Sequence, residues 1–236
     1  MTKLIYEGKA KKIFETTNPD QLLMEYKDSL TAFNALKKGE FSGKGKLNCQ
    51  ISTLLFKLLS KNKIPHHWVS TQNQNQMVVL KTKIIPLEVV IRNYVAGSLA
   101  KKLGIEEGRK LNAPLVELYY KDDALADPFV SDDQAFEFGW VQKDQLSQMK
   151  TLALSINQIL TSNFAEVELR LIDFKLEFGL NKSGHIVLAD EISPDCMRLW
   201  DMQTNEKLDK DRFRRDLGNV QQAYEQVLQR IERIQI

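Results

Sequence analysis

Short apolar stretches alternate with turn residues over the first thirty positions, a pattern typical of strands. Gly8 and the Asn18-Pro19-Asp20 turn separate three of these stretches. We therefore expect a meander of three strands at residues 4–7, 12–16 and 22–26. Further strands are expected at residues 68–71, 77–81, 84–95, 167–180 and 185–190.

Three longer segments carry apolar residues at helical spacing. The first begins at Lys46 and ends at Asn62, the second covers residues 146–160, and the third covers residues 220–234. A short helix is expected to end at Gly104. Two segments show no clear period: we expect 112–140 to be an irregular acidic stretch with a long loop, and 191–200 to be an active-site loop.

Strands dominate the first part of the chain and long helices the second, which indicates the α+β class. A length of 236 residues allows one large domain or two tightly joined lobes. Because no proline- or glycine-rich linker interrupts the sequence, a division near residue 81 would separate two lobes of one body.

Composition and charge narrow the class of protein. A formal net charge of +2 argues against a nucleic-acid-binding protein. No apolar run approaches the roughly 20 residues of a membrane helix, and the N-terminus lacks the apolar region of a signal peptide. We therefore expect a cytoplasmic protein without a membrane partner, in which Cys49 and Cys196 are free thiols. Residues 1–50 hold nine lysines against six acidic residues, which would suit a small anionic ligand.

The strongest chemical pattern lies in residues 171–191. An Asn-Lys-Ser-Gly turn separates two apolar runs, and a loop of two or four residues there pairs positions whose numbers sum to 365. In this register Glu177 and Asp190 are diagonal neighbours about 7 to 8 Å apart. Their face also carries Asp173 and Lys175. Such a group suits Mg²⁺ and nucleotide phosphates; a solvated polar face with cross-strand ion pairs is the alternative.

The turn after the first strand could bind phosphate. Gly8 would let backbone N–H groups approach the ligand, and the lysines that follow would add positive charge. The same pattern is more typical of a plain exposed hairpin turn. Neither a Walker P-loop nor the His-Arg-Asp loop of protein kinases is present in the sequence.

Arg92 and Ser98 form a second candidate phosphate site. Arg92 would offer a planar fork near the end of a strand, and Ser98 a hydroxyl beside a helix N-terminus. Alternatively, Arg92 could merely pair with Glu88 on the same strand face. The basic residues at 210–215 could likewise form a solvated surface.

Taken in order, these segments resemble the SAICAR synthetase family, the phosphoribosylaminoimidazole-succinocarboxamide synthases. The matching segments are YEGKAKKIFE (6–15), TAFN (31–34), IIPLEVVIRNYVAGSLAKKLGIEEG (84–108), LIDFKLEFG (171–179), LADEISPD (188–195), RLWD (198–201) and DKDRFRRDLG (209–218). They span nearly the whole chain.

The resemblance implies two α+β lobes with a nucleotide cleft between them: a β-rich nucleotide-binding lobe at 1–81 and a larger substrate- and metal-binding lobe at 82–236. It implies an ATP-dependent, amide-forming ligase of purine biosynthesis that joins the carboxylate of an aminoimidazole ribonucleotide (CAIR) to the amine of L-aspartate, giving SAICAR, ADP and phosphate. An acyl phosphate intermediate is expected, because phosphorylation makes the carboxylate an electrophile. Mg²⁺ and a homodimer are also implied.

The resemblance also implies roles for individual residues. ATP would be bound by Gly8, Lys9, Lys11 and Lys81; Mg²⁺ by Glu177 and Asp190; the ribonucleotide phosphate by Arg92, Ser98 and Arg198; and the imidazole and reacting carboxylate by Lys121, Asp127, Asp173 and Lys175, the last two as catalytic residues. In one departure, Cys196 and Met197 stand where the family often has small or hydroxyl residues, which puts a hydroxyl contact to phosphate there in doubt.

Two other classes of function fit the same pattern. One is a kinase-like phosphotransferase that modifies a small metabolite, and the other is a nucleotide-binding module without catalytic activity. An aspartate-dependent amide product would distinguish the ligase from both.

Overall fold

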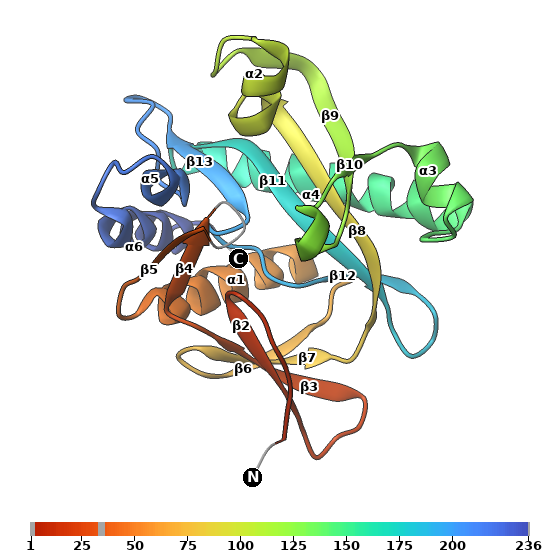
Figure 1. Ribbon diagram of the computed structural model, residues 1–236. Helices are drawn as coiled ribbons and strands as arrows, with labels where there is room; N and C mark the ends of the chain where they lie inside the picture. Colours follow the sequence, from red (N-terminus) through yellow and green to blue (C-terminus); the bar gives the residue numbers. More distant parts are fainter. Residues whose placement is uncertain (1–2, 33–35, 236) are drawn as a thin grey trace.

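The N-terminal lobe is built on an antiparallel sheet (Figure 1). The computed structural model describes residues 3–32 and 36–235. In spatial order the five strands are β1 (Leu4–Glu7), β2 (Lys11–Glu15), β3 (Gln21–Tyr26), β7 (Gln76–Leu80) and β6 (Trp68–Asn73). The predicted meander is therefore confirmed. A separate hairpin of β4 (Ser29–Ala32) and β5 (Lys37–Glu40) was not expected, and part of the TAFN motif lies outside the described residues.

The C-terminal lobe contains a six-stranded antiparallel sheet centred on one long strand, β11 (Leu169–Leu180). Nine of the twelve residues of β11 are buried, because strands flank both of its edges and α4 packs against it. The other strands are β8 (Lys83–Tyr94), β9 (Lys110–Tyr120), β10 (Phe129–Val130), β12 (Ile186–Ala189) and β13 (Met197–Asp201). The molecule is thus an α+β protein with two lobes.

One edge of β11 is shared by two short strands. β12 pairs with residues 177–180 of β11, whereas β13 pairs with residues 169–174 of the same strand. The chain between β12 and β13, residues 190–196, leaves the sheet at this gap. It stays attached there because the Lys175 N–H donates to the Cys196 carbonyl over 2.8 Å. This arrangement places the loop beside the central strand.

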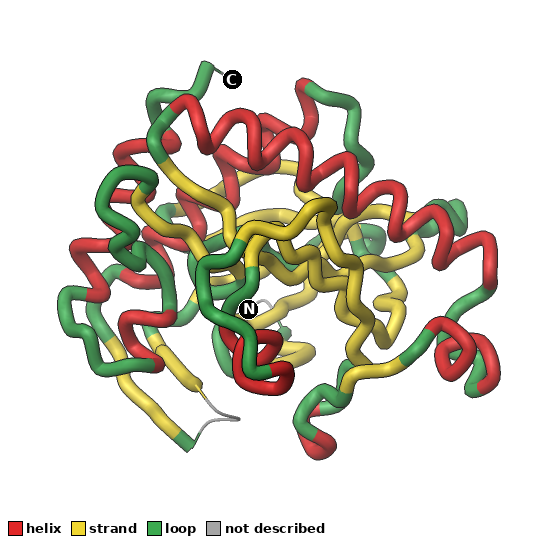
Figure 2. Tube along the Cα trace, turned by 90° about the horizontal axis from the view of Figure 1, so that it is seen from above, coloured by secondary structure: helices red, strands yellow, loops and turns green. Residues whose placement is uncertain are grey.

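The helices cover the sheets and join the lobes. α4 (Lys143–Glu166) runs across one face of the C-terminal sheet and buries Met149, Ile156 and Phe164 against it (Figure 2). α1 (Lys44–Lys61) packs on both α6 (Val220–Ile231) and β3. The shorter helices are α2 (Gly97–Leu103), the 3₁₀ turn η1 (Asp123–Leu125), α3 (Asp132–Glu137) and α5 (Asp211–Arg214). Among residues 3–32 and 36–235, none of the helices combines the length and apolar character needed to cross a bilayer.

The expectation of irregular structure at 112–140 was wrong. β9, η1, β10 and α3 lie there or extend into it. β9 shows little periodicity because Leu118 is its only fully buried residue. The start of α3 could have been predicted from the sequence, because Ser131 and Gln134 form a reciprocal capping box. The segment 191–200 also contains part of a strand, β13.

The predicted hairpin register was wrong by one residue. Glu177 pairs with Ala189 and Leu180 pairs with Ile186, so paired positions sum to 366. The reason is a loop of odd length, residues 181–185, closed by the Asn181 N–H donating to the His185 carbonyl over 3.0 Å. A one-residue shift would move Asp190 to the face opposite Glu177 if β12 continued. The strand instead ends at Ala189.

Candidate active site

Two cavities meet between the lobes. The larger, about 580 Å³, is lined by apolar residues of β3 and β7 at one end and by charged residues of β11 and the 190–196 loop at the other. The smaller, about 330 Å³, lies over β8, β11, β13 and α5. Eight residues line both cavities and define what we call the junction: Lys9, Thr31, Glu88, Asp127, Lys175, Asp195, Cys196 and Lys210. A reaction between ligands in the two cavities would occur at this junction.

Alternate residues of β11 place three charged side chains on the cavity face. Asp173, Lys175 and Glu177 stand opposite Arg92, Val90 and Glu88 of β8 in an uninterrupted ladder. Phe174 and Leu176, which point to the other face, are buried in the core. The predicted division of this strand into a charged and an apolar face is therefore confirmed.

Lysines neutralise the buried carboxylate of Glu177. Its Oε1 accepts hydrogen bonds from Lys121 at 2.8 Å and from Lys175 at 2.7 Å. Lys175 also donates to Glu88 over 2.7 Å. Burial lowers the pKa of Lys175, but the carboxylates of Glu177 and Glu88 outweigh it and hold that pKa well above its usual range. Lys175 therefore remains charged at the junction.

Asp190 joins the same charge cluster by an unusual backbone turn. Its φ of 61° lies in the left-handed region, and its carbonyl accepts a hydrogen bond from His67 Nε2 at 2.8 Å. Its carboxylate pairs with Lys11, which also lies 3.2 Å from Glu191. Burial favours the neutral acid, but Lys11 and Lys175 outweigh it and lower the pKa of Asp190. The turn thus keeps the Asp190 carboxylate in the larger cavity with Glu177, despite the shifted register.

Hard oxygen ligands for a cation are available in this cluster. Among the described residues, no three His, Cys, Asp or Glu side chains are grouped tightly enough to hold a metal alone. Glu177 and Asp190 both line the larger cavity, and Mg²⁺ usually takes one or two protein carboxylates together with water and phosphate oxygens. The donor set therefore fits a cation bound together with a phosphorylated ligand.

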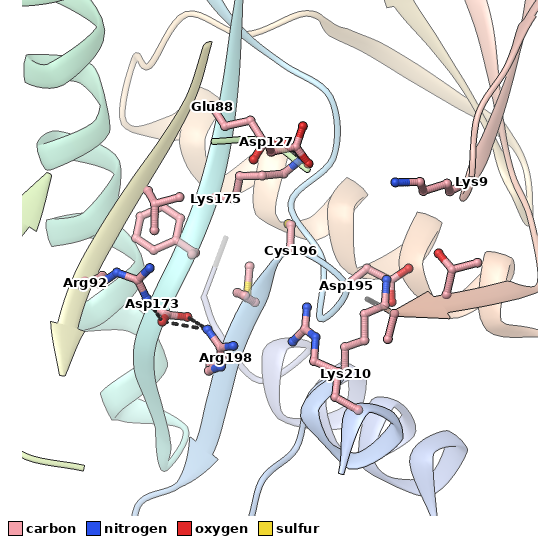
Figure 3. Close-up of a pocket in the computed structure, with 16 residues that line it drawn as sticks. Lys9, Glu88, Arg92, Asp127, Asp173, Lys175, Asp195, Cys196, Arg198 and Lys210 are labelled. Carbon is pink, nitrogen blue, oxygen red and sulfur yellow. Dashed lines mark hydrogen bonds and ion pairs between the residues drawn. The ribbon is translucent and has the colours of Figure 1, made fainter. Parts of the chain in front are cut away.

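At the far end of the smaller cavity, two arginines share one buried carboxylate (Figure 3). Asp173 Oδ2 accepts from Arg92 at 2.9 Å and from Arg198 at 2.8 Å. Arg92 also donates to Glu117 over 2.7 Å and to the Ser98 hydroxyl over 3.1 Å. The alternative in which Arg92 pairs with Glu88 is therefore wrong. Both arginines line the smaller cavity and form an end suited to a phosphate, whereas Ser98 contacts Arg92 from outside the lining.

The other predicted site residues do not all line the cavities. The Gly8 N–H donates to the Lys11 carbonyl over 2.8 Å, which confirms the turn. Lys9 crosses to the other lobe and binds Asp123 at 2.7 Å. Asp127 lines both cavities at the junction. Lys81 is exposed and lies outside both cavity linings.

Several site residues were missed from the sequence. Lys44, only 1% exposed, forms a 2.6 Å ion pair with Asp195, whose other oxygen accepts from the Tyr224 hydroxyl at 2.7 Å. Lys210 and Arg214 line the smaller cavity, so the solvated-surface interpretation is wrong for them. The charge-rich motif at 209–218 could have indicated a binding function for these residues. The sequence pattern alone could not show that the motif lies beside the cavity.

Cys196 stabilises the loop with its thiol. Its Sγ donates to the Ser193 carbonyl at 3.2 Å and accepts from the Ser193 N–H at 3.2 Å. Both cysteines are unpaired, as predicted. Burial raises the pKa of Cys49 and of Cys196 to about 12.

These pKa values predict slow thiol chemistry. At pH 8 a pKa of about 12 leaves only about one thiol in ten thousand ionised, against about a quarter for an ordinary cysteine. We expect the folded protein to react with DTNB at least about a hundredfold more slowly than a free thiol, and faster as the pH rises. Unfolding in guanidinium should release two reactive thiols. Rapid reaction of either cysteine in the folded protein would contradict this environment.

Comparison with known proteins identifies the family. A family model described as SAICAR synthetase matches residues 4–231. Phosphoribosylaminoimidazole-succinocarboxamide synthase of Campylobacter jejuni is 56% identical over 98% of this chain and 99% of the relative. The enzyme of that name from Bacillus cereus is 52% identical over 97% and 96% of the two chains.

Solved structures agree with the sequence relatives. The phosphoribosylaminoimidazole-succinocarboxamide synthase of Ehrlichia chaffeensis superposes with a TM-score of 0.96 at 45% identity, covering 99% of this chain and 100% of that one. A SAICAR synthetase in complex with ADP gives 0.94 at 47% identity, covering 97% of each chain. With the two-lobed fold and the charged face of β11 in the expected segments, the chain belongs to the SAICAR synthetase family.

Proposed function

We propose that this protein joins the carboxylate of CAIR to the amine of L-aspartate with consumption of ATP, giving SAICAR, ADP and phosphate in purine biosynthesis. The observation that carries the proposal is the junction, where charged β11 residues lie between an apolar slot and an arginine-rich end. Relatives whose sequences are more than 50% identical to this chain carry the name of the enzyme that catalyses this reaction.

The larger cavity would hold ATP. Its apolar end, with Leu22, Val79 and Leu80, suits an adenine ring. At its charged end Gly8, Lys9 and Lys11 would surround the phosphates. Residues 1–81 would then be the nucleotide-binding lobe and 82–236 the substrate- and metal-binding lobe. Lys81, outside the lining, would lie near the hinge between them without touching the base.

Glu177 and Asp190 would hold Mg²⁺ when ATP binds. Lys121 and Lys11, which neutralise these carboxylates in this structure, lie beside the same space. With the carboxylates bound to the ion, these lysines would donate hydrogen bonds to phosphate oxygens instead. When bound, the ion would neutralise phosphate charge during phosphoryl transfer. The protein's own contribution is to hold both carboxylates on a rigid strand and turn.

The smaller cavity would hold the ribonucleotide. Arg92, Arg198 and Ser98 would bind its phosphate, and Asp173 would keep both guanidinium groups in place. Lys121, Asp127 and Lys175 lie toward the larger cavity and would contact the imidazole and its carboxylate. The imidazole carboxylate would then face the nucleotide at the junction.

This placement explains how an unreactive carboxylate becomes an acyl donor. In-line attack of the CAIR carboxylate on the γ-phosphoryl group would form an acyl phosphate and release ADP. The unprotonated amine of aspartate would then attack the acyl carbon, form the amide bond and expel phosphate. Lys175, fixed by two carboxylates at the junction, would stabilise negative charge on the transferring group.

A single assay tests the function. With CAIR, ATP and Mg²⁺, we expect amide formation and sustained ADP release only when L-aspartate is present. Mass spectrometry of the products and coupled ADP detection measure both. A phosphorylated metabolite without an amide would indicate a phosphotransferase, and nucleotide binding without turnover would indicate a non-catalytic module; either result would overturn the ligase.

We also propose that the enzyme is a cytoplasmic homodimer. The family resemblance supports the dimer, and two free thiols are typical of a reducing compartment. Multi-angle light scattering would measure a mass near twice the 27.2 kDa of one chain.

A further inference from the structure

The junction contains three lysines, of which one lacks a carboxylate partner. Lys9 and Lys175 each lie 2.7 Å from a carboxylate oxygen. For Lys210, no carboxylate of residues 3–32 and 36–235 comes within the 4.0 Å limit of an ion pair. Lys210 therefore places an ammonium group without a direct carboxylate contact where the two cavities meet.

The neighbouring charges also act on Lys210. Asp195, the acid with the largest effect on Lys210, already forms a 2.6 Å ion pair with Lys44. Arg214, on the next turn of the chain, is bound to Asp211 at 2.6 Å and lines the smaller cavity. Burial lowers the pKa of Lys210, and nearby cations add to that effect against the opposing influence of Asp195. An additional anion would relieve this repulsion.

The position of Lys210 is fixed by the backbone. Its N–H donates to the Pro194 carbonyl over 3.3 Å, and its own carbonyl accepts from Phe213 and Arg214 at 3.0 Å. These bonds join the start of α5 to the 190–196 loop. In Figure 3 Lys210 and Asp195 stand across the cavity from Arg92 and Asp173. The backbone of Lys210 is thus fixed at the side of the cavity opposite the arginine pair.

We propose that Lys210 binds a carboxylate of the L-aspartate substrate and so holds its amine at the junction. This inference rests on the proposed ligase function. The amine must reach the activated carboxylate, so aspartate must bind where both cavities open. Aspartate also brings two negative charges into an enclosed site, and burying them requires a nearby cation. Lys210 meets both requirements, whereas Arg92 and Arg198 are bonded to Asp173 at the far end.

Lys210→Gln tests the proposal by substrate kinetics. We expect the KM for aspartate to rise about thirtyfold, the factor that corresponds to losing a charge-assisted hydrogen bond of about 2 kcal/mol. The KM values for ATP and CAIR should stay within about twofold of wild type, because other residues would bind those substrates. Lys210→Arg, which keeps the charge, should recover part of the aspartate affinity.

Lys182→Gln is the matched control, because it removes an exposed lysine of the β11–β12 turn that lines neither cavity. Thermal melting of each variant establishes that it is folded. Should Lys210→Gln fail to fold, Lys210→Met, which also removes the charge, is measured instead, and an aspartate KM equal to that of wild type would overturn the proposal. An unchanged aspartate KM in Lys210→Gln, or an equal rise for ATP or CAIR, would also overturn it. Wild-type enzyme without amide-forming turnover would refute the proposed function itself, a separate result.

Discussion

Glu177→Gln and Asp190→Asn are each expected to lower kcat by two orders of magnitude or more. Both changes keep side-chain volume and remove a negative charge that, in the proposed function, holds Mg²⁺ against the triphosphate. Part of the loss should be recovered at high Mg²⁺ concentration, because a weakened site still binds at saturation. Initial rates over a Mg²⁺ titration measure both effects.

The control for this experiment is Asp20→Asn. Asp20 pairs with Lys182 at an exposed site, so its charge is removed without touching either cavity. Its kcat should equal that of wild type. Normal rates at limiting Mg²⁺ in both cavity variants would exclude Glu177 and Asp190 as metal ligands and would place the ion elsewhere.

Asp173→Asn is expected to destabilise the protein by about 3 kcal/mol, because it leaves the buried guanidinium group of Arg92 and the partly buried one of Arg198 without their shared anion. Asp173 is 3% exposed and Arg92 is equally buried. Glu117 and Asp211 still bind the two arginines, so the fold should survive. The KM for the ribonucleotide should rise as well, since the arginines lose their fixed orientation. Urea unfolding and steady-state kinetics provide the measurements.

A comparison with Asp132→Asn separates burial from the simple loss of an ion pair. Asp132 pairs with Lys150 at an exposed position, where such a pair contributes about 1 kcal/mol or less. Equal unfolding free energies for the two variants would show that the Asp173 cluster is no more important to stability than a surface pair.

The charged face of β11 was predictable because alternation along a strand determines which side chains share a face. Asp173, Lys175 and Glu177 needed no further information. The prediction that Asp190 lies near Glu177 relied on a wrong hairpin register. Asp190 lies in the cavity only because the strand stops and the backbone adopts a left-handed turn. A loop of odd length cannot be distinguished from an even one by turn residues alone.

Residues that act across long sequence separations could not be located by pattern. Lys44 and Asp195 are 151 positions apart, and their pairing depends on how α1 packs against the C-terminal lobe. His67 supports Asp190 from a different lobe. Local periodicity predicts helices and strands, but it carries no information about which of their ends line the same cavity.

The regular ladder along β11 also determines the length of molecule that the site can accept. Asp173 and Glu177 are four residues apart in an extended strand, which separates the arginine-rich end from the acidic end by about 13 Å. Because β8 and β11 are paired without a bulge over this stretch, that spacing cannot adapt to a shorter or longer ligand. An imidazole carboxylate lacking its ribose phosphate would contact one end of the site only. The site would therefore distinguish metabolites by their length as well as by the chemistry of the imidazole ring.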